Sequence, residues 1–270
     1  MKNALSVDVE DWYQGILQIG YNQWSQYEER LSKGLNKVLD LFAKYNARAT
    51  FFVLGYIADK FPEAVERIAR GGHEVASHGY YHRPIFEQTP QEFEEDVSRS
   101  KKIIESITNT KVKGYRAPFF SVRKDTLWAL DILEELGFEY DSSIFPTKNF
   151  LYGIPDSAHT AYKAGKGKLV EFPLSVIGRG RFTIPVCGGF YMRVMPYKLI
   201  KHGIRHFNRS KGPAVIYMHP WELDKEKPKL PMPLKWRIIY DYNIKTMGSK
   251  IERLINDFSF TTIGEVLFGG

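Results

Sequence analysis

The sequence predicts an α/β protein built around a parallel sheet. Short runs rich in β-branched and aromatic residues alternate along the chain with longer stretches whose apolar residues recur every three or four positions. This alternation is typical of βα units, whose strands pair in parallel. The length of 270 residues suits one large domain, and a single α/β barrel commonly reaches that size. We therefore expect one domain that spans residues 1–270.

The first two strands and the first two helices follow from residue type and spacing. Residues 4–9 (ALSVDV) and 49–55 (ATFFVLG) have the composition of buried strands. Between them, apolar side chains recur at intervals of three and four over residues 31–42, which predicts a helix. Residues 62–69 form the next expected helix, because proline is favoured in a first helical turn and a glycine pair follows directly.

Three more strands and two more helices continue the alternation. Thr89, Pro90 and Glu92 form a capping box with a first-turn proline, which predicts a helix that runs to about residue 107. The segments HEVAS, KGYRAP and FEYDSS have strand composition. The remaining elements of this part are strands at residues 73–77, 113–118 and 138–143, and a helix at residues 124–136.

Beyond residue 145 the pattern is looser. Residues 145–195 contain glycines, prolines and short apolar runs such as LVEFPLSVI, which indicates an inserted sheet or long loops over one end of the fold. PAVIYMHP at residues 213–220 predicts the last core strand, and a proline-rich loop leads to a long basic helix near residues 234–257. We expect the core to end near residue 222 and residues 223–270 to pack on it as a C-terminal extension.

Composition limits the compartment and the classes of partner. The single cysteine, Cys187, excludes an internal disulfide framework and fits a reducing compartment. Acidic residues from position 8 interrupt any signal-peptide core, and no later apolar run approaches the roughly 18 residues of a membrane span, so we expect a cytoplasmic protein. The net charge is +7, but lysine and arginine are scattered except in the last third, which predicts a solvated basic surface and no nucleic-acid partner.

Polar residues stand at the ends of several predicted strands. Each follows the point where the chain leaves a strand for a helix or loop, and in a parallel α/β barrel catalytic groups gather at that rim. Any one of them has an ordinary structural explanation, but their shared position predicts a catalytic site. The residues are Asp8, Glu10, Asp11, His78, Arg116, Asp141 and His219.

Five segments around these residues resemble the motifs of a known family. In chain order they are SVDVED, SHGYYH, YRAPFF, YDSSIFP and IYMHPWE, and they span residue 5 to about residue 222. They are similar to the five motifs of the polysaccharide deacetylases, the NodB-homology group or carbohydrate esterase family 4. DVEDW, GGFYMRVMP and HPWE most resemble the branch found with exopolysaccharide and exosortase gene clusters.

The resemblance implies a fold, a cofactor and a reaction. The fold would be a distorted (β/α) barrel of about seven strands, with the looser region inserted and a helix at the C-terminus. The cofactor would be a divalent metal, most often Zn²⁺, with Co²⁺, Ni²⁺ or Mn²⁺ as alternatives. The reaction would be hydrolysis of an N-acetyl or O-acetyl group on a sugar in a polysaccharide or its precursor.

The resemblance makes His78 and His82 two of the metal ligands. Their H-x-x-x-H spacing would place both rings on one side of a helical turn, about 6 Å apart, although Gly79 can make the turn irregular. The third ligand is either Glu10 or Asp11, because many family members have two adjacent aspartates where this chain has DVED. We favour Asp11 slightly, since the following WY suggests that the strand has ended.

The resemblance also assigns the remaining roles. Asp8 matches the general base, and Arg116 matches the arginine that keeps that carboxylate ionised and oriented. His219 matches the general acid, and Asp141 the carboxylate that keeps it cationic. The backbone N–H near Phe119 would stabilise the oxyanion. Two further aromatic residues, Phe120 and Trp221, are candidates for lining the acetyl pocket or stacking on the sugar.

Two rival functions fit the same residues. The first is an allantoinase-like or other small-molecule C–N hydrolase on this fold, since such enzymes also depart from the adjacent-aspartate pattern. The second is a non-catalytic glycan-binding module that kept the barrel and lost turnover. A serine hydrolase is disfavoured because no G-x-S-x-G segment occurs. Cys187 lacks a paired base, and His73 begins a strand, so we expect neither to act in catalysis.

The expected partner is an acetylated sugar or oligosaccharide. A cytoplasmic location would favour a sugar nucleotide, a lipid-linked intermediate at the inner leaflet, or a glycan reached without the usual secretion route. The basic final helix allows weak association with a membrane surface, although an ordinary solvated helix face explains it better. Its basic residues are Lys235, Arg237, Lys245, Lys250 and Arg253. The sequence leaves the identity of the sugar and the oligomeric state open.

Overall fold

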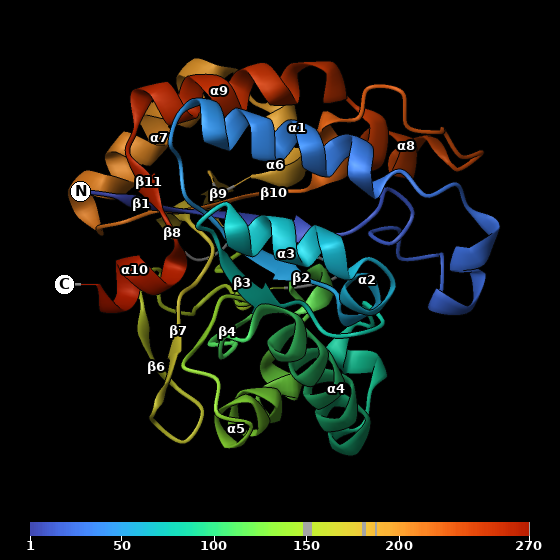
Figure 1. The fold of residues 1–270 in the computed structure, drawn as a ribbon. Helices are drawn as coiled ribbons and strands as arrows, with labels where there is room; N and C mark the ends of the chain where they lie inside the picture. Colours follow the sequence, from blue (N-terminus) through green and yellow to red (C-terminus); the bar gives the residue numbers. More distant parts are fainter. Residues whose placement is uncertain (148–152, 180–181, 187, 270) are drawn as a thin grey trace.

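A computed structural model describes residues 1–147, 153–179, 182–186 and 188–269, which form an α/β fold with a curved sheet (Figure 1). Neighbouring strands are parallel, except that the last one pairs antiparallel. In sheet order the strands are β10 (Val215–Met218), β1 (Asn3–Val9), β2 (Thr50–Val53), β3 (Glu74–Ser77), β4 (Gly114–Tyr115), β5 (Tyr140–Asp141), β7 (Leu169–Glu171) and β6 (Tyr162–Ala164). Two short additions are β11 (Phe260–Thr261), parallel to β1, and an antiparallel pair, β8 (Val176–Arg179) and β9 (Phe182–Pro185).

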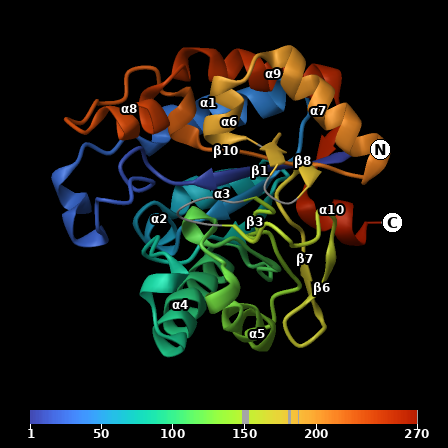
Figure 2. The same ribbon diagram turned by 180° about the vertical axis from the view of Figure 1, so that it is seen from behind.

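Helices surround this sheet. In both ribbon views α1, α7 and α9 lie along one side of the molecule, and α4 and α5 lie along the opposite side (Figures 1 and 2). The helices are α1 (Leu31–Lys44), α2 (Gly55–Lys60), α3 (Pro62–Arg70), α4 (Pro90–Thr108), α5 (Trp128–Glu135), α6 (Gly189–Val194), α7 (Tyr197–Ser210), α8 (Leu234–Asp241), α9 (Met247–Asp257) and α10 (Ile263–Phe268). None of the helices in these described ranges combines the length and the apolar composition that crossing a bilayer requires.

The core has two parts, one on each face of the sheet. Strands β1, β2 and β10 are buried throughout, as expected for parallel strands covered on both faces. Neighbouring residues of β2 point to opposite faces, so Phe51 packs in the cluster beneath the helices and Phe52 in the smaller cluster inside the curve. The inner cluster also contains Phe120 and Phe145, and it forms the floor beneath the strand ends.

The predicted α/β class is confirmed, and most predicted elements occur within a few residues of their expected bounds. The strands expected at 113–118 and 138–143 are shorter, because only two residues of each remain in the ladder. The single long helix expected at 234–257 is wrong. The chain forms α8 and α9 instead, and Asn243 between them adopts a left-handed conformation (φ 55°) that ends the helical path.

Strand register brings the predicted rim residues together. Val7 pairs with Met218, so Asp8 and His219 leave neighbouring strands at the same level. Ser77 pairs with Tyr115 in the same way, which places the following residues, His78 and Arg116, side by side. The carboxyl ends of β1, β3, β4 and β10 therefore share one edge of the sheet.

His73 is a structural histidine that should make the fold sensitive to acid. Its ring packs on Phe42 and Phe51, and its Nδ1 accepts the Ala49 N–H at 3.4 Å. Burial, with a contribution from the positive charge of Arg48, lowers the pKa of His73 to about 4. Between about pH 6.5 and about pH 4 the unfolded chain binds a proton that the folded protein excludes, so the free energy of unfolding falls as the pH falls.

We expect His73→Phe to remove this part of the acid sensitivity. The contribution of His73 to this change in the free energy of unfolding is at most about 2 kcal/mol, allowing for the partial exposure of the ring. Urea denaturation at a series of pH values would measure it. The exposed His206 provides the control, since His206→Phe should leave the pH slope unchanged. Equal slopes for wild type and His73→Phe between pH 4 and 6.5 would contradict the assignment.

Candidate active site

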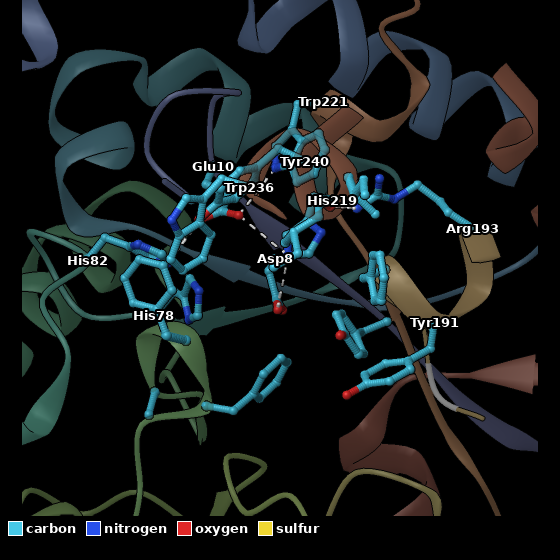
Figure 3. Close-up of a pocket in the computed structure, with 18 of the residues that line it drawn as sticks. Asp8, Glu10, His78, His82, Tyr191, Arg193, His219, Trp221, Trp236 and Tyr240 are labelled. Carbon is cyan, nitrogen blue, oxygen red and sulfur yellow. Dashed lines mark hydrogen bonds and ion pairs between the residues drawn. The ribbon is translucent and has the colours of Figure 1, made fainter. Parts of the chain in front are cut away.

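A buried cluster of two imidazoles and one carboxylate lies at the shared strand edge. Glu10, His78 and His82 each offer a ligand atom, and these atoms all lie within 4.8 Å of one another (Figure 3). The Nδ1 of His78 donates to the Arg116 carbonyl at 2.7 Å, because a carbonyl can only accept, and its Nε2 therefore carries the lone pair. Burial, followed by the charge of His82, lowers the pKa of His78 well below its usual range, so the ring is neutral.

The segment between the two histidines is an irregular loop. The expected helical turn is absent here: Gly79 has φ 73° and His82 has φ 53°. Asp96 of α4 holds the loop, because its carboxylate accepts the N–H groups of Tyr80 at 2.7 Å and Tyr81 at 3.2 Å. The imidazole centroids are still 5.0 Å apart. The two rings are therefore close together, as the spacing predicted, although the helical turn that was expected to bring them together is absent.

Glu10 supplies the carboxylate of the cluster. Its Oε2 lies 2.9 Å from the His82 Nε2, yet this buried oxygen has no hydrogen-bond partner with acceptable geometry. Burial alone would raise the pKa of Glu10, but the charges of His82 and His219 outweigh it and lower that pKa. A neutral imidazole, a second imidazole and an ionised carboxylate are the donor set that divalent zinc accepts, so these residues fit a metal ion.

Asp11 lies outside this cluster. Its carboxylate accepts the backbone N–H groups of Arg30 at 2.7 Å and Leu31 at 2.9 Å, where α1 begins, and of Trp12 at 2.7 Å. Asp11 therefore caps a helix that starts 20 residues later in the chain. Burial raises its pKa to about 6 in spite of these bonds. Of the two ligand candidates left open by the sequence, Glu10 is the one we carry forward.

Asp8 and Arg116 form a buried ion pair beside the cluster. The Arg116 Nη1 donates to the Asp8 Oδ1 at 2.7 Å and to the Ser6 hydroxyl at 2.8 Å. The guanidinium also donates to the carbonyl of Ser142 at 2.9 Å and stacks 4.1 Å from the centre of the Phe52 ring. These contacts fix one oxygen of Asp8 and leave the other, Oδ2, on the side of the pocket.

His219 faces the cluster from the end of β10, the strand next to β1. Its Nε2 lies 3.4 Å from the Glu10 Oε1 and 4.0 Å from the Asp8 Oδ2, and its Nδ1 lies 3.2 Å from the Glu222 Oε2. Burial lowers the pKa of His219, but Glu10 and Glu222 more than compensate and raise it to about 9. The buried Arg193 donates through Nε to the other oxygen of Glu222 at 2.8 Å, so Glu222 is held from both sides.

Asp141 occupies a different position from the one expected. Its Oδ1 accepts the hydroxyl of Ser143 at 2.5 Å, and the buried Glu171 lies beside it. Burial, together with the charge of Asp141, raises the pKa of Glu171 well above its usual range, which keeps that carboxyl protonated. Asp141 thus supports the β5 end of the sheet, and Glu222 stands next to His219 where Asp141 was expected.

A pocket of about 470 Å³ opens over these groups. Its polar end contains Asp8, Glu10, His78, His82 and His219, and its walls are mostly aromatic. Phe119, Phe120 and Trp221 line it, and Trp221 stacks on His219 with ring centres 5.2 Å apart. The other wall residues are Phe190, Tyr191 and Arg193 of α6, Tyr217 of β10, and Lys235, Trp236, Ile238, Ile239 and Tyr240 of α8.

Sequence reasoning missed the residues behind His219 and the wall formed by α8. Glu222 and Arg193 lie within the quoted HPWE and GGFYMRVMP segments, so the resemblance pointed to them without assigning a role. Trp236 and Tyr240 stand in a helix expected only to be basic, and no motif marks them. Cys187 lies outside the described residues.

Comparisons with known proteins divide the chain into two matched parts. Residues 24–140 match the family model described as polysaccharide deacetylase, and residues 142–268 match one described as a domain of unknown function (DUF3473). The first part contains both histidines of the cluster and Arg116. The second contains His219, Glu222 and α8.

Curated relatives and solved structures agree with the first match. The chain is 33% identical to the peptidoglycan deacetylase of Helicobacter pylori over 41% of this chain and 37% of that protein. It is 32% identical to the peptidoglycan-N-acetylglucosamine deacetylase of Bacillus cereus over 35% of each chain, so it spans little more than a third of these relatives. A Mycobacterium smegmatis protein provisionally named a polysaccharide deacetylase has a similar fold, with a TM-score of 0.61 and 23% identity over 96% of this chain and 85% of that one.

Substitutions of Glu10 and Asp11, the two acidic residues that follow β1, should have different effects on the metal affinity of the protein. We expect Glu10→Gln to weaken zinc binding at least about tenfold, because the substitution removes a charged donor from the cluster. Asp11→Asn should leave zinc affinity within a few fold but lower the free energy of unfolding by about 1–2 kcal/mol, because it disturbs the α1 cap. Competition against a chromophoric chelator and chemical denaturation would measure the two effects. A loss of zinc affinity in Asp11→Asn alone would reverse the assignment.

Proposed function

We propose, from the match of residues 24–140 to the polysaccharide deacetylase family model, that the protein is a metal-dependent hydrolase that removes an N-acetyl group from a sugar. The reaction would consume water, break the amide C–N bond and give acetate and a free amine. One observation supports this above all: Asp8 and His219 converge on the Glu10, His78 and His82 cluster at the polar end of one pocket. We also propose a single domain, because β11, near the C-terminus, pairs with β1.

Glu10, His78 and His82 would hold the metal, which we propose to be zinc. Three protein donors of this kind leave coordination positions open, and a zinc ion so bound lowers the pKa of a water molecule and polarises a carbonyl group. Asp8 would accept the proton of the attacking water at its Oδ2. Arg116 fixes the other oxygen of that carboxylate, so the base keeps its orientation.

His219 would donate a proton from Nε2 to the departing amine. Its raised pKa, about 9, supplies the protonated imidazole at neutral pH. Glu222 orients the ring through Nδ1, and Arg193 orients Glu222. We retain the backbone N–H of Phe119 as the oxyanion donor, and Phe120 and Trp221 as the lining of the acetyl pocket, because all three residues border the pocket beside the cluster.

The products of the reaction separate this function from its rivals. Release of acetate together with a new sugar amine distinguishes a sugar deacetylase from an allantoinase-like enzyme, which would give ammonia or ureide products. Sugar binding without any turnover would favour the glycan-binding module. The link to exopolysaccharide gene clusters and a cytoplasmic location remain predictions from the sequence.

Asp8→Asn should lower kcat by about 10²- to 10⁴-fold, the usual range for loss of a general base. The substitution keeps the shape of the side chain, so zinc affinity should change little. The assay follows acetate release from N-acetylated chito-oligosaccharides by the zinc-loaded protein. The exposed Asp125→Asn serves as a control and should retain wild-type activity. A wild type that releases no acetate from any acetylated sugar, or an Asp8→Asn variant as active as wild type, would refute the proposal.

Glu222→Gln should lower kcat by about 10- to 100-fold while KM changes little, because Glu222 positions the acid and does not touch the substrate. Glu222→Asp should recover part of the loss, since it restores the negative charge beside the imidazole. Glu226→Gln, on an exposed residue four positions further along the chain, is the control. Equal losses in the Gln and Asp variants, with lowered stability in both, would mean that Glu222 acts only in folding.

A further inference from the structure

The outer face of α8 exposes an apolar stripe. Leu234 and Ile238 lie one helical turn apart on α8, where Ile238 also borders the pocket, and Tyr242 follows directly after the helix ends at Asp241. Their exposed fractions are 69%, 42% and 50%, whereas side chains of this kind are normally buried. Both ribbon views place α8 at the rim of the molecule (Figures 1 and 2). Among the described helices of eight or more residues, α8 is the one with no buried side chain.

Basic side chains flank this stripe. The exposed Lys225 and Lys229 precede α8, Lys235 and Arg237 lie on it, and Lys245 follows it. Of the acidic residues in the same stretch, Glu226 is exposed, and Asp241 is paired with the buried Lys227. An exposed apolar stripe between cations is the pattern of a helix that lies in the interface of an anionic membrane. We call α8, with residues 225–233 before it, the α8 edge.

The α8 edge is continuous with the pocket. The same helix turns Trp236, Ile239 and Tyr240 toward the site, and Figure 3 shows Trp236 and Tyr240 beside Glu10. Arg193 anchors the helix from within, because it donates to the carbonyls of Ile239 at 2.6 Å and Tyr242 at 3.0 Å. A surface that binds the outside of α8 would therefore lie next to the mouth of the pocket.

We propose that the α8 edge docks on an anionic lipid bilayer and that the pocket takes an acetylated sugar carried by a membrane lipid. The second part rests on the proposed deacetylase function, whereas the docking does not. Charge favours a bilayer over a second copy of this chain, since two α8 edges face to face would bring like charges together. An apolar sugar carrier also suits a pocket whose walls are aromatic and aliphatic and whose rim bears Lys235.

The docking is tested with vesicles of phosphatidylcholine, alone or mixed with phosphatidylglycerol. We expect zinc-loaded wild type to co-sediment with the mixed vesicles and to bind them at least about tenfold less in high salt. The variant carries Leu234→Glu and Arg237→Glu, two exposed residues of α8 that do not line the pocket. It should lose at least about tenfold in vesicle binding, because it removes one apolar contact and reverses one charge.

A matched control carries Leu127→Glu and Lys124→Glu. It makes the same changes in charge and apolarity, also three residues apart, at exposed positions by α5 on the opposite side of the molecule. The control should bind vesicles like wild type. Absence of wild-type binding, equal loss in both variants, or equal binding to pure phosphatidylcholine would each overturn the proposal. So would a wild-type dimer in light scattering that the Leu234→Glu, Arg237→Glu variant dissolves.

Activity assays on a soluble and on a membrane-embedded substrate distinguish a wrong assignment of the membrane-borne substrate from a wrong assignment of the deacetylase function. On a soluble N-acetylated oligosaccharide the α8 variant should be as active as wild type. On an N-acetylglucosamine lipid embedded in the mixed vesicles its kcat/KM should fall at least about tenfold. Equal activity of both proteins on the embedded lipid would overturn the membrane-borne substrate while leaving the deacetylase function intact.

Discussion

The buried guanidinium of Arg116 is the constraint on which both sheet and site depend. It is fully enclosed, so its charge must be compensated within the protein, and it donates to Asp8 on β1 and to Ser142 just after β5. Its own backbone carbonyl accepts Nδ1–H of His78, which fixes the tautomer of a ring that faces Glu10. One residue thus joins the ends of three strands and sets the direction of both the base and an imidazole. β4 and β5 are short, but backbone bonding between the strands continues just beyond them, since the Arg116 N–H donates to the Ser77 carbonyl and the Ser142 N–H to the Tyr115 carbonyl, each at 3.0 Å.

The negative charge of Glu10 links the two halves of the site. It lies between His82 and His219, so the same carboxylate completes the donor cluster and raises the pKa of the acid. Gly15 allows this position, because a Cβ atom there would stand 2.6 Å from the Glu10 Oε1. Trp221 closes the remaining side and donates to that oxygen at 3.3 Å. The carboxylate is therefore held by its surroundings before any ion is bound.

Sequence predicted the parts of this structure that depend on local pattern. The parallel sheet, most helices and the shared edge follow from periodicity and caps, and the motifs located Asp8, Arg116 and the histidines. The sequence-based predictions failed where the contacts of a carboxylate cannot be inferred from its neighbours in the sequence. Asp11 looks like a ligand because its partner, the start of α1, lies 20 residues away in sequence. Glu222 has the spacing of a capping box with His219, so its sequence position alone suggests a turn and hides its contact with the imidazole.

Contacts between residues distant in the sequence also connect the two matched parts of the chain. The donor cluster of Glu10, His78 and His82 precedes residue 142, whereas His219 and the residues that orient it follow residue 142. From His219 a continuous set of buried interactions runs through Glu222 to Arg193, and from Arg193 to the last carbonyls of α8. Arg193 is almost fully buried, so its charge needs Glu222, and the carbonyls of Ile239 and Tyr242 satisfy its remaining donors. The helix that walls the pocket is thereby tied to the residue that orients the acid.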